Sequence, residues 1–143
     1  MMRKKVITGV ALTLSALSLA WAAETMWIHR TDNTTLGLSI ANADSVSLNG
    51  SNVVFTATNG VTKSMPNTEV EKVTLGEASS MVEIKYNGSD AEIINPFAFE
   101  GVEVTKNGAD VVVTSTSTSE ITYELTGTTT VGSLKVYSEK KSS

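Results

Sequence analysis

The sequence predicts an all-β protein, in which a small antiparallel repeat module precedes a second region of β-hairpins. Apolar and polar residues alternate over short segments rich in Val, Ile and Thr, as in half-buried strands. No segment after residue 22 keeps the 3.6-residue period of an amphipathic helix. Asn-Gly favours the type I′ turn of a β-hairpin. Four such pairs separate alternating segments: Asn49-Gly50, Asn59-Gly60, Asn87-Gly88 and Asn107-Gly108.

Residues 1–22 have the pattern of a secretory signal peptide. Arg3, Lys4 and Lys5 form a basic start, and the apolar segment 6–20 is shorter than the about 20 residues that a membrane helix needs. Ala20-Trp21-Ala22 is a small-x-small cleavage site, so we expect the mature chain to begin at Ala23. No cysteine is present there for lipid attachment. The alternative is an uncleaved N-terminal anchor. We therefore expect a secreted or extracytoplasmic protein, in the periplasm, at the cell surface or outside the cell.

The charge balance argues against binding to nucleic acid and to anionic membranes, and an acidic polymer could be bound only through a local basic patch or a bridging metal. The chain has 11 basic and 15 acidic side chains, and loss of the three basic residues of the leader leaves 8 against 15, a net charge of −7. Nucleic acid and anionic membranes both reward clusters of Lys and Arg, so neither is an expected partner. The chain has no cysteine, so packing alone stabilises it, although an exported chain can use disulfides.

A repeat of 27 residues covers the first half of the mature chain. Shifting the sequence by this length places Thr31 on Thr58, Val46 on Val73 and Leu48 on Leu75. Each copy is interpreted as a hairpin, a polar or single helical turn (residues 41–44 and 68–71) and a short strand. Chance similarity between Thr- and Ser-rich β sequences is the alternative to duplication. We predict a duplicated β-hairpin module over residues 23–76.

The character of the sequence changes after this module. Residues 77–81 are mostly small and polar and are predicted to form a linker, and residues 82–143 form a second β segment. The last predicted strand, Leu134 to Tyr137, lies near the end of the sequence. Such a strand either pairs with an earlier one or leaves an open edge that is prone to self-association.

The residue types needed for enzyme catalysis are scarce, so we expect no enzyme. His29 is the only histidine and lies in a predicted strand, where a solvent-facing residue is the more ordinary interpretation. A Ser-His-Asp triad around another base cannot be built, and most acidic residues alternate with apolar ones on solvent faces. Glu120, Thr122 and Glu124 lie on one strand face and could contribute to a calcium site only if other oxygens joined them. The sequence leaves the metal undetermined.

Aromatic residues provide the candidate ligand-binding positions. Trp27 is opposite in phase to the apolar Ile28 and can present its ring for stacking on sugars. Phe97 and Phe99 are two residues apart in the segment Asn-Pro-Phe-Ala-Phe-Glu-Gly, and in an extended loop both rings would point the same way. The alternative for this pair is that it closes the open end of a sheet.

Several motifs in the last 60 or so residues resemble, in order, the start of a family of secreted bacterial carbohydrate-binding proteins. They are Tyr86-Asn87-Gly88, the segment 102–113, Tyr123 to Thr128, Gly132 to Tyr137 and the pair Lys140-Lys141. The resemblance implies a right-handed parallel β-helix that binds cellulose and pectic polysaccharides, with calcium on the body of the helix. In that family an apolar strand and many further coils follow the lysine pair, whereas here Ser142-Ser143 follow. We therefore expect an N-terminal part of such a protein, and no ligand-binding residue is carried over by position.

Two functions follow from these observations. The first is a secreted, non-enzymatic carbohydrate-binding protein that recognises a plant-type polysaccharide at the cell exterior, with Trp27, Phe97 and Phe99 as candidate ligand-binding residues. The second is a structural or adhesive β-module that associates through an exposed β edge and binds no sugar. No cofactor is evident from the residues themselves, and calcium is implied only by the resemblance.

Overall fold

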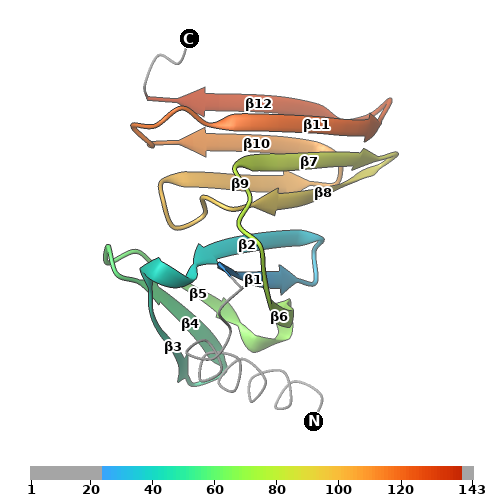
Figure 1. Ribbon diagram of the computed structural model, residues 1–143. Helices are drawn as coiled ribbons and strands as arrows, with labels where there is room; N and C mark the ends of the chain where they lie inside the picture. Colours follow the sequence, from blue (N-terminus) through green and yellow to red (C-terminus); the bar gives the residue numbers. More distant parts are fainter. Residues whose placement is uncertain (1–23, 140–143) are drawn as a thin grey trace. The chain divides into compact units, whose positions relative to one another are not determined.

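The computed structural model describes residues 24–139, and the predicted signal peptide lies outside them. The described chain contains twelve strands and two short 3-10 turns, so the predicted all-β class is confirmed (Figure 1). The chain divides into two compact units, residues 1–78 and 79–143, with the boundary inside the segment predicted to be a linker. Within the described residues, no helix is long and apolar enough to cross a membrane.

The first unit contains two copies of one element order. The first copy consists of β1 (Thr25–Arg30), β2 (Thr34–Ser39), the 3-10 turn η1 (Ile40–Asn42) and β3 (Ala43–Asn49). The second copy consists of β4 (Asn52–Ala57), β5 (Thr62–Pro66), η2 (Asn67–Glu69) and β6 (Val70–Gly76). The bounds of β1, η1 and β3 each reappear 27 residues later in β4, η2 and β6, so the structural period equals the sequence period.

The two copies exchange their third strands. β1 lies between its hairpin partner β2 and β6 of the second copy, while β4 lies between its hairpin partner β5 and β3 of the first copy. All four of these ladders are antiparallel. A two-stranded hairpin is at best marginally stable alone, so the exchanged strand gives each hairpin the third strand that it needs.

Equivalent hydrogen bonds fix this exchange in both copies. The backbone amide of Thr31 donates to the carbonyl of Glu69 at 3.0 Å, and Thr58, 27 residues later, donates to Asn42 at 2.8 Å. The loops also match, because the carboxylate of Asp32 accepts the amide of Thr34 at 3.0 Å and the side chain of Asn59 accepts the amide of Val61 at 3.0 Å. The core positions correspond as well: Met26, Ile28 and Leu38 match Val53, Phe55 and Met65, and all six are buried.

The second unit consists of two hairpins and two further strands. Its elements are β7 (Met81–Asn87), β8 (Asp90–Asn95), β9 (Val102–Asn107), β10 (Asp110–Ser115), β11 (Thr122–Thr128) and β12 (Ser133–Ser138). β7 pairs with β8 and β9 with β10 in antiparallel hairpins. β11 then adds to β7 and β12 adds to β10, both in parallel (Figure 1).

The core of this unit lies between the two hairpins. Val82 and Ile84 from β7 and Val111 and Val113 from β10 are fully buried, and alternation along each strand directs them to the same side. Ala91, Ile93 and Val102 complete the buried cluster. Burying a Val or Ile side chain contributes about 1.5–3 kcal/mol, so this cluster is the main source of stability in the unit.

The predicted turn type is not the one that forms. Asn49, Asn87 and Asn107 are the last residues of their strands and pair with Asn52, Asp90 and Asp110, which leaves two-residue loops that begin with glycine. Gly50, Gly88 and Gly108 have φ values of 65°, 65° and 59°, whereas none of these asparagines has positive φ. Positive φ at the first loop position alone is the requirement of a type II′ turn rather than type I′. The positions of these three hairpins were predicted correctly, but their turn type was not. The sequence does not show that the asparagine forms the last residue pair of the hairpin and so lies outside the two-residue loop.

A glycine on β11 should be essential for the parallel addition of this strand. Gly127 lies opposite Tyr86 with φ of 82°, and a Cβ atom there would collide with the carbonyl oxygen of Tyr86. We expect Gly127→Ala to lower the free energy of unfolding of the second unit by about 2–4 kcal/mol, because backbone strain and steric overlap add. Urea unfolding would measure this loss.

Gly88→Ala is the matched control in the same unit. Gly88 also has positive φ, at 65°, but a Cβ there has no atom within 4 Å. We expect this variant to lower the free energy of unfolding by about 1 kcal/mol, from backbone strain alone. Equal losses in the two variants would show that the close approach of β11 to β7 does not limit the residue at position 127.

Candidate functional site

Two surfaces of the described chain hold side chains that can bind a partner. One is the face of the first unit that carries Trp27, and the other is the end of the second unit formed by β11 and β12. Each lies within one unit, and we describe them separately. We call them the Trp27 face and the open end.

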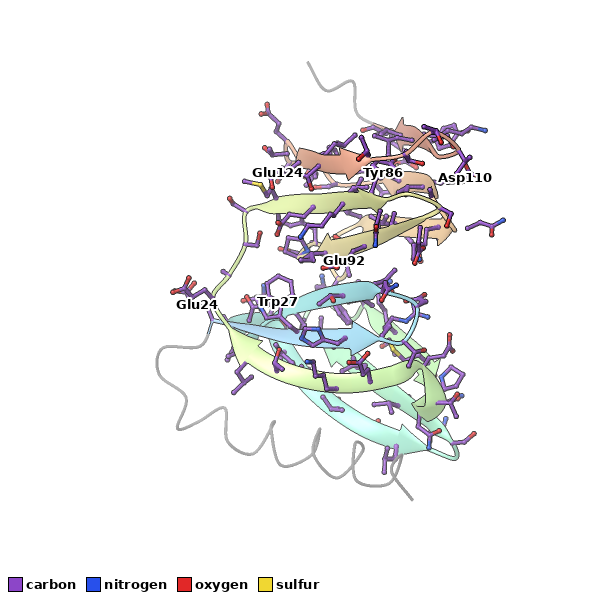
Figure 2. The ribbon with its side chains drawn as sticks, turned by 90° about the vertical axis from the view of Figure 1, so that its right-hand side faces the viewer. Glu24, Trp27, Tyr86, Glu92, Asp110 and Glu124 are labelled. Carbon is purple, nitrogen blue, oxygen red and sulfur yellow. The ribbon has the colours of Figure 1, made fainter. Side chains whose placement is uncertain are left out.

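The Trp27 face is built by alternation along β1. Met26 and Ile28 are buried, so Trp27 and His29 point to the opposite side of the strand. Trp27 lies opposite Gly37 on β2 and Thr74 on β6. Its indole Nε1 donates a hydrogen bond to the carbonyl of Glu77 at 3.2 Å, which fixes the ring. A Cβ atom at Gly76 would lie 3.3 Å from the ring, so glycine leaves space for the indole there (Figure 2).

His29 joins two threonine hydroxyls on this face. Its Nε2 is 2.8 Å from Oγ1 of Thr74, and its Nδ1 is 3.4 Å from Oγ1 of Thr35. Burial lowers the pKa of His29 below 6.5, and the positive charge of Lys72 lowers it further, while Glu71 acts in the opposite direction. A neutral imidazole between two hydroxyls orders the surface beside Trp27 and supplies no charge. The Trp27 face is therefore an aromatic ring bordered by an imidazole and hydroxyl groups, with the exposed, cationic Lys72 of β6 opposite His29.

Phe97 and Phe99 do not form the exposed pair that an extended loop would give. Residues 96–101 fold into turns instead. The side chain of Asn95 closes them: it accepts the amide of Phe97 at 3.0 Å and donates to the carbonyl of Val102 at 2.9 Å. The ring of Phe99 is 2% exposed, and Phe97 is half-buried against the core of the unit. Phe99 therefore offers no stacking surface in this conformation, and Trp27 belongs to the other unit.

The open end of the second unit exposes residues that face inward. Leu125 is in register with Ile84 and Val136 with Val113, so all four side chains point toward the space between the two hairpins. Ile84 and Val113 are fully buried, whereas Leu125 and Val136 are 49% and 48% exposed. Within the described residues, β11 pairs only with β7 and β12 only with β10, because each is the last strand on its side. The row of apolar core residues thus continues to a layer that no residue between 24 and 139 covers fully.

Several polar side chains interact at the end of the second unit where the hairpin turns lie. Lys106, whose side chain is 9% exposed, is 2.6 Å from the carboxylate of Asp90. The hydroxyl of Tyr86 donates to the carbonyl of Ser133 at 3.0 Å, and the hydroxyl of Ser133 donates to Asp110 at 2.8 Å (Figure 2). Burial raises the pKa of Tyr86, and the charge of Asp110 adds to this. The Lys106–Asp90 pair joins β9 to β8, and the two bonds of Ser133 join the start of β12 to β7 and β10, so these contacts have a structural role.

The acidic residues of the described chain do not gather into a metal site. No group of three or more His, Cys, Asp or Glu side chains between residues 24 and 139 is placed to hold an ion. Thr122 and Glu124 are exposed on β11, while Glu120 precedes that strand. In the parallel register Glu124 lies beside Glu83 of β7, so two like charges are neighbours on the outer face.

Comparisons of the chain with protein-family models, with curated proteins and with solved structures found no match. The functional proposals below therefore rest on the geometry of the two surfaces alone.

The pKa of His29 gives a test of the structure of the Trp27 face. As the only histidine in the sequence, it has ring proton signals that nuclear magnetic resonance can follow without assignment by mutation. We expect a titration midpoint below 6.5 in the folded protein, a rise in Lys72→Gln and a further fall in Glu71→Gln.

The same shift predicts how stability depends on pH. The unfolded chain binds the histidine proton more readily than the folded protein, because the pKa of His29 is lower in the folded protein. The contribution of His29 to the free energy of unfolding is therefore complete above pH 6.5 and is lost as the pH falls through the folded pKa. A midpoint at or above 6.5, or opposite shifts in the two variants, would contradict the described surroundings of His29.

Proposed function

We propose that this protein is a non-enzymatic structural β-module that associates through the open end of its second unit. The observation that carries the proposal is the contrast between fully buried Ile84 and Val113 and half-exposed Leu125 and Val136 in the next layer. Apolar side chains on the inner face of a two-sheet core are stable when covered, because covering them removes apolar surface from water.

The backbone supports the same function. β11 and β12 each use one side for their parallel ladders and present the other side as an edge. Unpaired backbone groups along a strand edge are a template for further strands. A pair of strands added to these two edges would extend both sheets and cover Leu125 and Val136 in one step.

The order of strands suggests that the second unit is the start of a β-helix. β10, β11 and β12 follow one another along the chain, and the first and third pair in parallel while the second joins the opposite sheet. We propose that these strands form the first coil of a solenoid, and parallel crossovers of this kind are overwhelmingly right-handed. Solenoids bury their core by stacking coils, so a single coil leaves its last layer uncovered. We propose that the resemblance to β-helix proteins reflects this arrangement. From the signal-peptide pattern of residues 1–22, we also propose that the protein acts outside the cytoplasm.

Sedimentation velocity over a range of concentrations tests the association. We expect the mature protein to associate independently of added sugar and Val136→Lys to weaken the association about tenfold or more, because a charge would enter the inward-facing layer. Val131→Lys is the matched control, since Val131 is 68% exposed but lies in the loop between β11 and β12. Equal effects of the two variants would indicate general surface adhesion, and a monomer at every concentration would refute the proposal.

Carbohydrate binding is a second candidate function, favoured by the Trp27 face. The indole of Trp27 is held by Glu77, and hydroxyl and imidazole groups from Thr35, Thr74 and His29 lie on the same face. An aromatic ring with hydrogen-bonding neighbours can stack on a sugar and bind its hydroxyls. The ligand of this face would be a plant-type polysaccharide such as cellulose, as the sequence resemblance implies.

Retention on insoluble cellulose tests this second function. We expect Trp27→Ala to reduce retention roughly tenfold, through loss of the stacking surface. Tyr137→Ala removes another exposed aromatic ring, from β12, and should leave retention unchanged. Circular dichroism would verify that both variants are folded. Absence of retention by the unchanged protein, or equal losses in the two variants, would reject carbohydrate binding at Trp27.

A further inference from the structure

We infer that the partner at the open end is a second copy of this chain, bound through a two-fold axis with β11 of each copy against β12 of the other. The inference rests on the proposed association through this end and adds the identity and the register of the partner. It depends on strand direction, on the phase of the side chains and on charge.

Strand direction permits this pairing. β11 and β12 lie side by side at the end of the second unit and run in opposite directions (Figure 1). A two-fold rotation about an axis between them and parallel to them places β12 of the second copy above β11. The rotation does not change the direction of either strand, so the new pair is antiparallel. The same operation places β11 of the second copy above β12, and both sheets continue across the interface.

The phase of the side chains restricts the register to pairings that place inward residues opposite inward residues. Leu125 on β11 and Leu134 on β12 both face inward, because they are in parallel register with the buried residues Ile84 and Val111. Pairing Leu125 with Leu134 of the second copy meets this condition, and among the pairings that do so it is the one that places Glu124 opposite Lys135. The adjacent pairs are then Tyr123 with Val136 of the second copy on the inner side, and Glu124 with Lys135 of the second copy on the outer side.

Charge complementarity then favours a second copy over an arbitrary strand. β11 contains one charged residue, Glu124, and β12 contains one of opposite sign, Lys135. Within its own copy Glu124 lies beside Glu83, and Lys135 lies beside the uncharged Val112. Lys135 of the second copy would approach Glu124 from its open side and offset the repulsion from Glu83. Cross-strand opposite charges stabilise a sheet, and like charges directly opposite destabilise it.

The other two-fold arrangement lacks this charge complementarity. If β11 paired with β11 and β12 with β12, neither strand pair would contain charges of opposite sign, because the one charged residue is Glu124 on β11 and Lys135 on β12. The two arrangements cover the same apolar residues, Leu125 and Val136 among them, so charge decides between them.

Charge exchange tests the inference. We expect Glu124→Lys and Lys135→Glu each to raise the dissociation constant of the dimer roughly tenfold, because each creates two like-charge pairs. The double variant Glu124→Lys/Lys135→Glu should restore the affinity of the unchanged protein. All three changes are at exposed positions, so folding should be unaffected, and circular dichroism would check this. Sedimentation equilibrium at low ionic strength would give the dissociation constants.

The outcomes separate the inference from the function on which it rests. Loss in both single variants with recovery in the double variant supports pairing of β11 with β12 of a second copy. No recovery in the double variant, while Val136→Lys still weakens association, overturns this pairing and leaves association through the open end intact. If Val136→Lys also has no effect, the open end is not the contact surface and both proposals fail.

Discussion

The organisation of this protein depends on one requirement: each strand must satisfy the hydrogen bonds of its backbone with partners distant in sequence. In the first unit a 27-residue repeat gives two hairpins, and neither is stable alone. The exchange of β3 and β6 supplies a third strand to each hairpin and ties the copies together. Equivalent backbone bonds at Thr31 and Thr58 show that both copies meet the requirement in the same way.

In the second unit, β11 and β12 meet this requirement along only one of their two sides. The hairpins β7–β8 and β9–β10 receive β11 and β12, and the buried rows that include Ile84 and Val113 gain a next layer in Leu125 and Val136. That layer has no cover among the described residues, and its two strands are edges. Our proposal of association rests on this combination of half-exposed core residues and open edges, because association would remove both from water.

The two surfaces are suited to different partners because their chemistry differs. The Trp27 face is an ordered set of an indole, an imidazole and two hydroxyls, and burial and the charge of Lys72 lower the pKa of the histidine. The ligand that we propose for this face is rich in hydroxyl groups. The open end is apolar inside and carries single opposite charges, Glu124 and Lys135, on its outer side. In the proposed association these charges would discourage indiscriminate strand addition and favour a partner with the complementary pattern.

Local sequence determined the β class, the hairpins at three Asn-Gly pairs and the period of the repeat, because alternation and turn residues act over a few neighbours. It also predicted a strand at Leu134 to Tyr137, which either pairs with an earlier strand or leaves an open edge. Only the tertiary structure decided that third strands are exchanged, that β11 and β12 add in parallel, and that Asn95 closes the turns that bury Phe99. These outcomes depend on strand partners and directions far apart in the chain, and a strand with alternating residues has the same pattern in either direction.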